Sequence, residues 1–229
     1  MVGARQARTY DSSNRRAQAL RTRERILDEA RRLFIANGFA ATSIAAVAAA
    51  AQVSSPTVFS AFGSKVNLLK EAAETTIVGD ARPIPMAERA EMQHVRDGKT
   101  AEDVLRRFAA LVAARSGEIY PIYSVIYNNR DGYPEIATLA DLLDDQRLTG
   151  AKAMAQAVLT RLEPEERTDE QQLAELRDCL WALMSLAWYE AFVVQRGWSV
   201  AAYQAWLSEA MIIPLRRRAA STPATSSRI

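Results

Sequence analysis

Residues 41–65 read ATSIAAVAAAAQVSSPTVFSAFGSK, and this stretch decides the fold of the N-terminal part of the chain. Apolar residues recur at helical spacing over positions 44–51, which predicts a short amphipathic helix. Thr42 and Ser43 stand directly before it, and either hydroxyl can accept a hydrogen bond from the unpaired N–H groups of the first turn. The first of two short helices is therefore expected to begin behind this pair.

A second short helix is expected after a tight turn. The apolar stripe stops at Gln52, and Ser54 or Ser55 can cap the next helix. Pro56 lies in the first turn of that helix, where its fixed φ and missing N–H are tolerated. Two short helices joined in this way predict a helix-turn-helix.

The second helix has one apolar wall and one wall suited to DNA. Val58 and Phe62 lie four residues apart and are expected to face inward. The opposite wall consists of residues that are mostly small or able to donate hydrogen bonds, namely Ser55, Pro56, Thr57, Phe59 and Ser60. A recognition helix needs such a wall to reach base edges in the major groove.

The motif lies inside a longer pattern of residues between positions 23 and 68. They are Arg23, Ile26, Leu27, Ala30, Leu33, Phe34, Gly38, Phe39, Thr42, Ser43, Val47, Ala48, Val53, Ser54, Thr57, Val58, Phe62, Ser64, Lys65 and Leu68. In type and spacing they resemble the signature of the tetracycline-repressor (TetR) family of bacterial transcription regulators. The resemblance implies an all-α protein with an N-terminal three-helix DNA-binding domain and a helical C-terminal domain for ligand binding and dimerisation.

Three positions depart from the pattern of that family. Gln52 replaces the usual glycine of the turn, Phe59 replaces the usual tyrosine, and Ala61 replaces a frequent polar or aromatic residue. The tyrosine usually supplies a hydroxyl to a phosphate, which Phe59 cannot do. Other residues are therefore expected to supply some of the phosphate contacts.

The resemblance assigns phosphate contacts to Thr42 and Lys65, each at a helix N-terminus, where free N–H groups favour an anion. Helix geometry and the motif positions together place the other DNA-contacting residues at Ser43, Ser54, Ser55, Pro56, Thr57, Phe59 and Ser60. Pro56 offers only apolar contact, which suits a thymine methyl group. The alternative for Ser55 and Thr57 is ordinary helix capping without a DNA role.

Charge is distributed unevenly along the chain. The formal net charge is +2, yet residues 1–70 hold eleven Lys and Arg against four Asp and Glu. This segment therefore carries +7 and the remainder −5. A basic N-terminal part on an acidic body is expected of a protein whose N-terminal domain binds DNA.

The first twenty residues lack helical periodicity and are expected to form a disordered basic arm, with the first helix starting near Thr22. The arm carries Arg5, Arg8, Arg15 and Arg16. We expect these arginines, Arg15 and Arg16 above all, to compensate for Phe59 and Ala61, either along the DNA backbone or in a narrow minor groove. The alternative is a solvated tail without a DNA role.

From Met86 onward the chain shows helical spacing without strand-like alternation, so the predicted fold class is all-α. We expect a DNA-binding domain with a connecting fourth helix at 21–80 and a helical ligand-binding and dimerisation domain at 81–218. A disordered tail is expected at 219–229. The sequence ARPIP at 81–85 marks the boundary, because two prolines interrupt helical hydrogen bonding.

The body is rich in aromatic residues at helical spacing. Those expected to line a pocket for a small apolar or aromatic effector are Tyr120, Tyr123, Tyr127, Trp181, Trp188 and Tyr189. The alternative is that these rings simply fill the core.

A single helix is expected over about 170–196, followed by a last helix over about 199–218. The first of these is apolar on more than one face, so more than one face must be covered. The residues expected to meet a second copy of the chain are Leu180, Met184, Ala187, Ala191, Val194 and Trp206.

Other chemistries find little support in the composition. The chain has a single histidine, His94, and a single cysteine, Cys179, so it cannot assemble a histidine-based triad, a multi-histidine metal site or an internal disulfide. No cofactor or metal is expected. The N-terminus is arginine-rich without a following apolar segment, and no apolar run is long enough to span a bilayer, so a cytoplasmic protein is expected.

The sequence thus predicts a ligand-responsive, homodimeric, DNA-binding regulator. The family resemblance implies a repressor that binds a palindromic operator and is released by a small-molecule effector. One alternative is an enzyme acting on an apolar small molecule, which the absence of a nucleophile or general-base constellation disfavours. Another is a constitutive, non-specific DNA-binding protein, which would bind a scrambled duplex as tightly as any genomic site.

Overall fold

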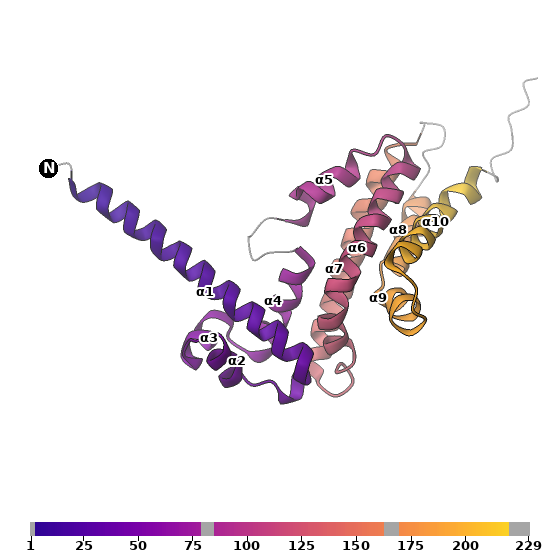
Figure 1. The fold of residues 1–229 in the computed structure, drawn as a ribbon. Helices are drawn as coiled ribbons and strands as arrows, with labels where there is room; N and C mark the ends of the chain where they lie inside the picture. The colour runs from indigo at the N-terminus through magenta and orange to yellow at the C-terminus, as the bar shows by residue number, and fades with distance from the viewer. Residues whose placement is uncertain (1–2, 79–84, 163–169, 220–229) are drawn as a thin grey trace, which may run out of the picture. The chain divides into compact units, whose positions relative to one another are not determined.

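The computed structural model describes residues 3–78, 85–162 and 170–219, and side chains between residues 14 and 216 within these ranges. The helices, in chain order, are α1 (Gly3–Ala41), α2 (Ile44–Ala50), α3 (Ser55–Phe62), α4 (Lys65–Val78), η1 (Met86–Glu88), α5 (Ala90–Arg96), α6 (Ala101–Tyr127), α7 (Pro134–Leu159), α8 (Glu170–Leu183), α9 (Leu186–Tyr189), η3 (Glu190–Gln195) and α10 (Val200–Ala219). No strand occurs among the described residues, so the all-α prediction is confirmed (Figure 1).

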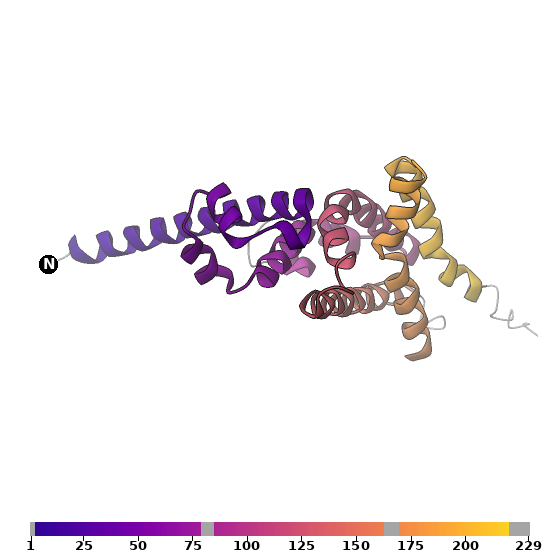
Figure 2. The ribbon, with the colours of Figure 1, turned by 90° about the horizontal axis from the view of Figure 1, so that it is seen from below.

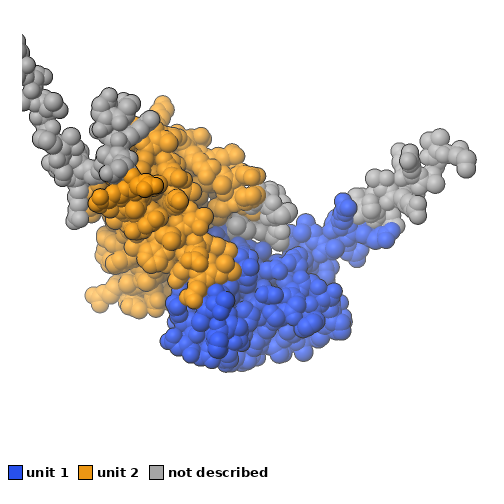
Figure 3. All heavy atoms as spheres, turned by 180° about the vertical axis from the view of Figure 1, so that it is seen from behind, with its two compact units in different colours: residues 1–83, 121–140 blue, residues 84–120, 141–229 orange. Residues whose placement is uncertain are grey.

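The chain divides into two compact units (Figure 3). Unit 1 comprises residues 1–83 and 121–140, and unit 2 comprises residues 84–120 and 141–229. Helices α6 and α7 therefore contribute to both units. The predicted domain boundary at residues 80–81 lies outside the described residues, as does the predicted tail at 219–229 from its second residue onward.

The core of unit 1 forms where α1 packs against α2 and α4, and α2 against α3. Ile26, Ala30 and Phe34 recur at intervals of four on α1 and are buried, as their spacing predicts. Val58 and Phe62 of α3 are buried as well, which confirms the expected inner wall of the second motif helix.

Helix α1 begins at Gly3 rather than near Thr22, and its N-terminal turns extend beyond α2 and α3 (Figures 1 and 2). No glycine or proline interrupts residues 4–37, and Ala, Arg, Gln and Leu all have high helix propensity. Regular helical geometry stops at Gly38, whose φ of 78° is accessible to glycine at little cost.

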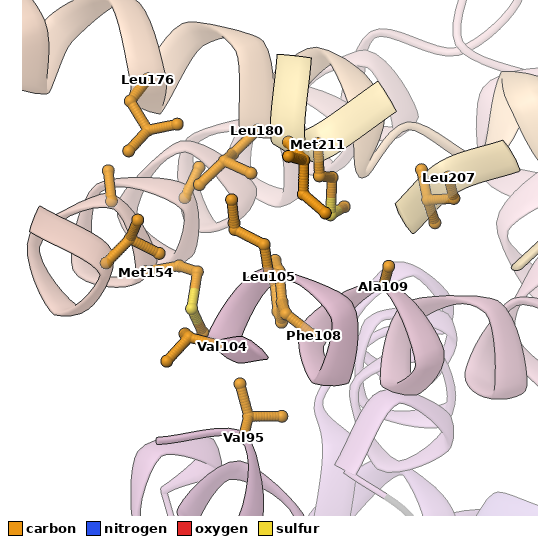
Figure 4. Packing of buried hydrophobic residues seen from close by; sticks show 14 of the residues in the cluster. Val95, Val104, Leu105, Phe108, Ala109, Met154, Leu176, Leu180, Leu207 and Met211 are labelled. Carbon is orange, nitrogen blue, oxygen red and sulfur yellow. The ribbon is translucent and has the colours of Figure 1, made fainter. Parts of the chain in front are cut away.

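Unit 2 is built around an apolar cluster contributed by α5 to α10, including Tyr189 of α9 (Figure 4). Leu105 and Phe108 of α6 lie among Met154 of α7, Leu180 of α8 and Met211 of α10 (Figure 4). Burial of apolar side chains of this size stabilises by about 1.5–3 kcal/mol each. The core therefore depends on helices that are far apart in sequence.

The single helix expected over 170–196 is broken in the structure. Helix α8 ends at Leu183, and Ser185 adopts an extended backbone with φ of −64° and ψ of 132°. Its hydroxyl accepts a hydrogen bond from the N–H of Ala187, and the indole N–H of Trp188 donates to the carbonyl of Ala182 at 2.9 Å. These side chains satisfy backbone groups that a continuous helix would otherwise pair, so the chain starts a new helix at α9 and continues as the π-helix η3.

Among the described helices, none is by itself long and apolar enough to cross a membrane. Helices α2 and α3 pass that test of length and composition only when taken together as a bent pair.

Candidate nucleic-acid interface

The turn between α2 and α3 sets the geometry of the interface. The two helix axes are bent by 111° relative to each other, within the range of about 90–120° typical of a helix-turn-helix. Ser43 caps α2, because its hydroxyl oxygen accepts a hydrogen bond from the N–H of Ala46 at 3.1 Å. Of the two candidates for this cap, Ser43 is therefore the residue used.

The C-terminus of α2 ends in a Schellman motif, with Gln52 where glycine is usual. The N–H of Val53 donates to the carbonyl of Ala48, and the N–H of Gln52 donates to the carbonyl of Ala49. This pairing requires a left-handed residue, and Gln52 has a φ of 54°. It is the only non-glycine residue with positive φ in the described part of the chain. The turn keeps its shape despite the missing glycine, at a cost in backbone strain.

Helix α3 presents its outer wall to solvent. Ser54 caps the helix, because its hydroxyl accepts a hydrogen bond from the N–H of Thr57 at 3.2 Å and lies 2.8 Å from the Thr57 hydroxyl. Pro56, Thr57, Phe59 and Ser60 are exposed, and Ser55 is half-buried. The Phe59 ring is 63% exposed, although burial is what a large apolar ring gains most from. An exposed aromatic ring on this wall is available for contact with a partner.

Cationic side chains hold the motif to the rest of unit 1. The guanidinium of Arg23 lies 4.4 Å from the centroid of the Phe62 ring, donates to the carbonyl of Ala61 and forms an ion pair with Glu71. Arg25 donates from Nε to the carbonyl of Ala51 at 2.8 Å, at the end of α2. Sequence reasoning assigned no such role to either arginine, although Arg23 belongs to the matching pattern.

Thr42 is placed differently from its prediction. The residue is only 1% exposed, and its hydroxyl donates to the backbone carbonyls of Leu33 and Gly38, at 3.1 and 2.8 Å. A hydroxyl buried in this way secures the end of α1 and does not face a phosphate. The predicted phosphate contact by the Thr42 side chain is therefore replaced by a structural role.

Lys65 begins α4, as predicted, directly after Ser64, whose hydroxyl accepts a hydrogen bond from the N–H of Asn67. Its ammonium donates to the carbonyl of Phe39 at 2.9 Å and lies 4.1 Å from the centroid of the Phe39 ring. An ammonium has three donors, so two remain after the bond to Phe39. Lys65 thus has a structural partner and retains donors for a phosphate.

An open groove of about 1010 Å³ runs between α1 and α3 in unit 1. Its lining includes Arg15, Arg16, Gln18, Ala19, Leu20, Thr22, Arg23 and Ile26 of α1, and Pro56, Thr57, Ser60 and Ala61 of α3. Arg15 and Arg16 are exposed, and the helix that carries them is continuous with the core helix of the unit. The structure therefore brings this arginine pair beside the recognition wall.

The predicted effector residues fall into separate groups. In unit 2, the Tyr120 ring lies 5.8 Å from the Tyr189 ring, and Tyr189 lies 5.7 Å from Tyr203. Burial, together with the nearby Glu190 carboxylate, raises the pKa of Tyr120 above its ordinary value. The rings of Tyr120 and Tyr189 are thus brought together next to a polar group.

The other predicted effector residues make different contacts. Trp181 packs under the guanidinium of Arg147 at 4.7 Å, and Trp188 lies 5.4 Å from Trp206. Tyr123 and Tyr127 stack on each other at 6.0 Å and belong to unit 1. Of the six predicted residues, the structure therefore pairs Tyr120 with Tyr189 in unit 2 and Tyr123 with Tyr127 in unit 1.

The predicted dimer residues are partly surface and partly core. Leu180 is fully buried in unit 2, so its assignment to an interface is wrong, because its side chain has no surface to offer. Ala187 and Val194 are exposed, with Val194 at 52% exposure, while Met184, Ala191 and Trp206 are half-buried. Sequence reasoning missed Trp198 and Val200, which are exposed apolar residues on either side of the start of α10. The break at Ser185 was the decisive feature that helical spacing did not reveal.

Within the described residues, no three or more His, Cys, Asp or Glu side chains gather in a group that could hold a metal ion. The arrangement on unit 1 is instead one of capped helices, exposed hydroxyls and arginines. Such groups suit hydrogen bonds to base edges and phosphates.

Comparison with known proteins identifies the motif and the fold. Residues 26–72 match the family described as bacterial regulatory proteins, tetR family. No curated protein matches the chain.

Several solved structures share the fold. A proposed transcriptional regulator from Pseudomonas aeruginosa PAO1 aligns with a TM-score of 0.62 at 16% identity, over 86% of this chain and 91% of that one. NalD, the secondary repressor of the MexAB-OprM multidrug efflux pump in the same species, gives 0.59 at 19% identity, over 85% and 95%. A proposed regulator from Saccharomonospora viridis, in complex with choline, gives 0.55 at 18% identity, over 82% and 93%. At these identities the likeness concerns the fold alone.

Proposed function

Because this chain belongs to the tetR family of bacterial regulatory proteins, we propose that it is a repressor that binds a palindromic operator as a homodimer and is released by a small-molecule effector. Members of this family and the structural neighbours are DNA-binding transcription regulators and not enzymes. The observation that carries the proposal is the outer wall of α3, on which Thr57 and Ser60 are exposed and the Ser54 cap bonds Thr57.

DNA recognition is proposed to combine base contacts with backbone contacts. The outer wall of α3, with Ser55, Pro56, Thr57, Phe59 and Ser60, enters the major groove, where hydroxyls and apolar groups distinguish base edges. The remaining donors of Lys65 bind a phosphate at the N-terminus of α4. Ser43, also exposed, lies at the N-terminus of α2 and contacts the adjacent backbone.

Dimerisation is proposed to use the apolar surface of α9, η3 and the start of α10. Val194, Trp198 and Val200 are exposed there. Trp188 is 38% exposed and contacts the Phe192 ring, as Trp198 also does. Exposed apolar residues that gather in this way mark interaction surfaces. A two-fold dimer would present two copies of α3 to two half-sites about one helical turn apart.

The effector is proposed to bind in unit 2 near Tyr120, Tyr189 and Glu190. Aromatic faces bind apolar and aromatic molecules, and they also attract organic cations. One structural neighbour was solved with choline, a cation of this kind. The carboxylate of Glu190 beside the rings suits a ligand that combines an apolar body with a polar or cationic group.

Release from DNA requires that the effector favour one arrangement of the protein over another. A ligand that binds both arrangements equally shifts neither population. The location is proposed to be cytoplasmic, where the operator would be accessible.

The test begins with selection of genomic fragments by the purified protein, followed by footprinting of the enriched sites. A protected palindrome occupied by two chains supports the proposal, and a scrambled duplex of equal length serves as the control. Equal affinity for both duplexes would instead indicate a non-specific DNA-binding protein.

The effector is then sought by thermal-shift screening of apolar, aromatic and cationic metabolites, with hits tested for operator release at matching concentrations. Tyr189→Phe and Glu190→Gln should weaken binding of a true effector, whereas Trp181→Phe, at a ring packed under Arg147, should not. Ligands that stabilise the protein but leave operator affinity unchanged would contradict the release mechanism.

A further inference from the structure

We propose that the groove between α1 and α3 holds the sugar–phosphate backbone of one DNA strand, so that α1 forms a second DNA-binding wall beside the recognition helix. This inference rests on the proposed function, because it assumes that α3 enters the major groove. It adds a specific role for the N-terminal half of α1, carried by Arg15 and Arg16.

The composition of the groove fits a nucleic-acid strand. Arg15 and Arg16 are exposed on the α1 wall, and guanidinium groups donate paired hydrogen bonds to phosphate oxygens. Leu20, Pro56 and Ala61 contribute apolar surface to the same groove, and the Leu20 side chain is exposed although it is apolar. Alternating phosphates and apolar deoxyribose faces match a groove that combines these arginines and apolar residues with the hydroxyl groups of Thr57 and Ser60.

The position of the groove identifies which polyanion it meets. Pro56, Thr57 and Ser60 belong both to its lining and to the outer wall of α3. When that wall enters a major groove, the strand that borders the major groove is the phosphate chain nearest to α3. The groove is therefore placed to receive that strand as recognition occurs.

The arginines of the N-terminal segment were expected either along the DNA backbone or in a narrow minor groove, and the helical state of α1 decides between these two sites. Helix α1 is continuous from Gly3 to the kink at Gly38. An α-helix with side chains is about 10–12 Å across, whereas the minor groove of B-DNA is only about 6 Å wide. A helix of this kind crosses the phosphate backbone and does not enter the minor groove.

The chain offers a matched control for testing this contact. Arg21 lies on the same helix within six residues of Arg15 and is exposed, but it does not line the groove. The double variant Arg15→Ala/Arg16→Ala should lower operator affinity about tenfold. It should also reduce the slope of log K against log salt by about 1.8, because each phosphate that is no longer neutralised removes about 0.9 from that slope. Arg21→Ala should change both quantities much less.

Neutralising individual phosphates locates the contact. In operator duplexes with single methylphosphonate substitutions, one or two positions should weaken binding of the unaltered protein but not of the Arg15→Ala/Arg16→Ala variant. Arg15→Lys/Arg16→Lys should retain most of the salt slope, because the charge remains, but it should reduce the affinity in part, because lysine cannot donate paired hydrogen bonds.

The outcomes separate this inference from the proposed function. If the unaltered protein selects no operator, the proposed function itself fails. If it binds a specific operator while Arg15→Ala/Arg16→Ala and Arg21→Ala behave alike, the groove does not hold DNA. The inference would also be overturned if the same methylphosphonate positions weakened binding of the unaltered protein and of the double variant. The groove would then be a candidate site for another partner, such as an acidic peptide.

Discussion

Replacing Gln52 with glycine should stabilise the protein. Gln52 holds the left-handed position of the Schellman motif at the end of α2, with a φ of 54°. Its side chain is exposed, so the substitution removes no buried contact. The change therefore acts on the backbone conformation alone.

The magnitude follows from two opposing effects. A left-handed conformation costs a residue with a β-carbon roughly 1–2 kcal/mol. Glycine avoids this cost, but it makes the unfolded chain more flexible, which destabilises the folded protein by about 0.5–1 kcal/mol. The net expectation is a gain of about 0.5–1 kcal/mol in the free energy of unfolding. For a chain of this size, that corresponds to a rise in Tm of about 1–4 °C.

The assay is urea unfolding followed by far-UV circular dichroism, with thermal melts in parallel. A matched control is Gln204→Gly in α10, because Gln204 is also exposed but lies in a regular helix. The same chemical change should there destabilise by about 1 kcal/mol. Gln52→Ala is a second control, since alanine keeps the β-carbon and should give no gain.

The reasoning is refuted if Gln52→Gly has a midpoint equal to or below that of the unaltered protein while Gln204→Gly behaves as expected. Operator affinity should be measured for the same variant. A stabilised variant with weakened DNA binding would indicate that glutamine is kept at this position for a contact with DNA.

Three further perturbations test the interface, the assembly and the core. Lys65→Ala should reduce the salt slope of operator binding by about one unit and weaken all sequences alike, whereas Thr57→Ala should also relax preference at one or two base pairs, as competition binding at several salt concentrations would reveal. Val194→Arg places a charge on the proposed dimer surface and should give a folded monomer by light scattering, so a variant that remains dimeric would move the interface elsewhere. Burial raises the pKa of Tyr203 to about 12 in the folded protein, against about 10 when unfolded. The contribution of this shift to the free energy of unfolding is complete below pH 10, and about 2–3 kcal/mol of it should be lost as the pH rises toward 12. Tyr203→Phe should remove this part of the pH dependence in urea unfolding.

The elements of unit 1 could be predicted because local rules decide them. Serine caps, a proline in a first turn and apolar residues at intervals of four give the positions of α2, α3 and α4 directly. The start of α1 was missed, because residues that form no apolar stripe can still be helical when nothing interrupts them. The break at Ser185 was missed for a different reason. It depends on a side-chain hydrogen bond from Trp188 to the carbonyl of Ala182, six residues earlier, and apolar spacing does not indicate such a bond.

The candidate site could be predicted only at the level of the motif. Exposure of Thr57 and Ser60 follows from helix geometry, so the recognition wall was accessible to sequence reasoning. The burial of Thr42 could not be predicted, because its hydroxyl reaches the carbonyls of Leu33 and Gly38 only through the direction that the chain takes at the end of α1. The groove between α1 and α3 could not be predicted either, since it requires that α1 be helical at Arg15 and Arg16.

The aromatic cluster of unit 2 allows the fluorescence of that unit to be recorded separately. All four tryptophans lie between residues 181 and 206, and Trp188, Trp198 and Trp206 each lie within 6.1 Å, centroid to centroid, of the Phe192 ring. Indole fluorescence under selective excitation therefore comes from unit 2 alone. A quencher or a binding event near these rings changes the spectrum, to which unit 1 contributes no tryptophan. Recording emission and ellipticity together would show whether the two units unfold in one transition or in two.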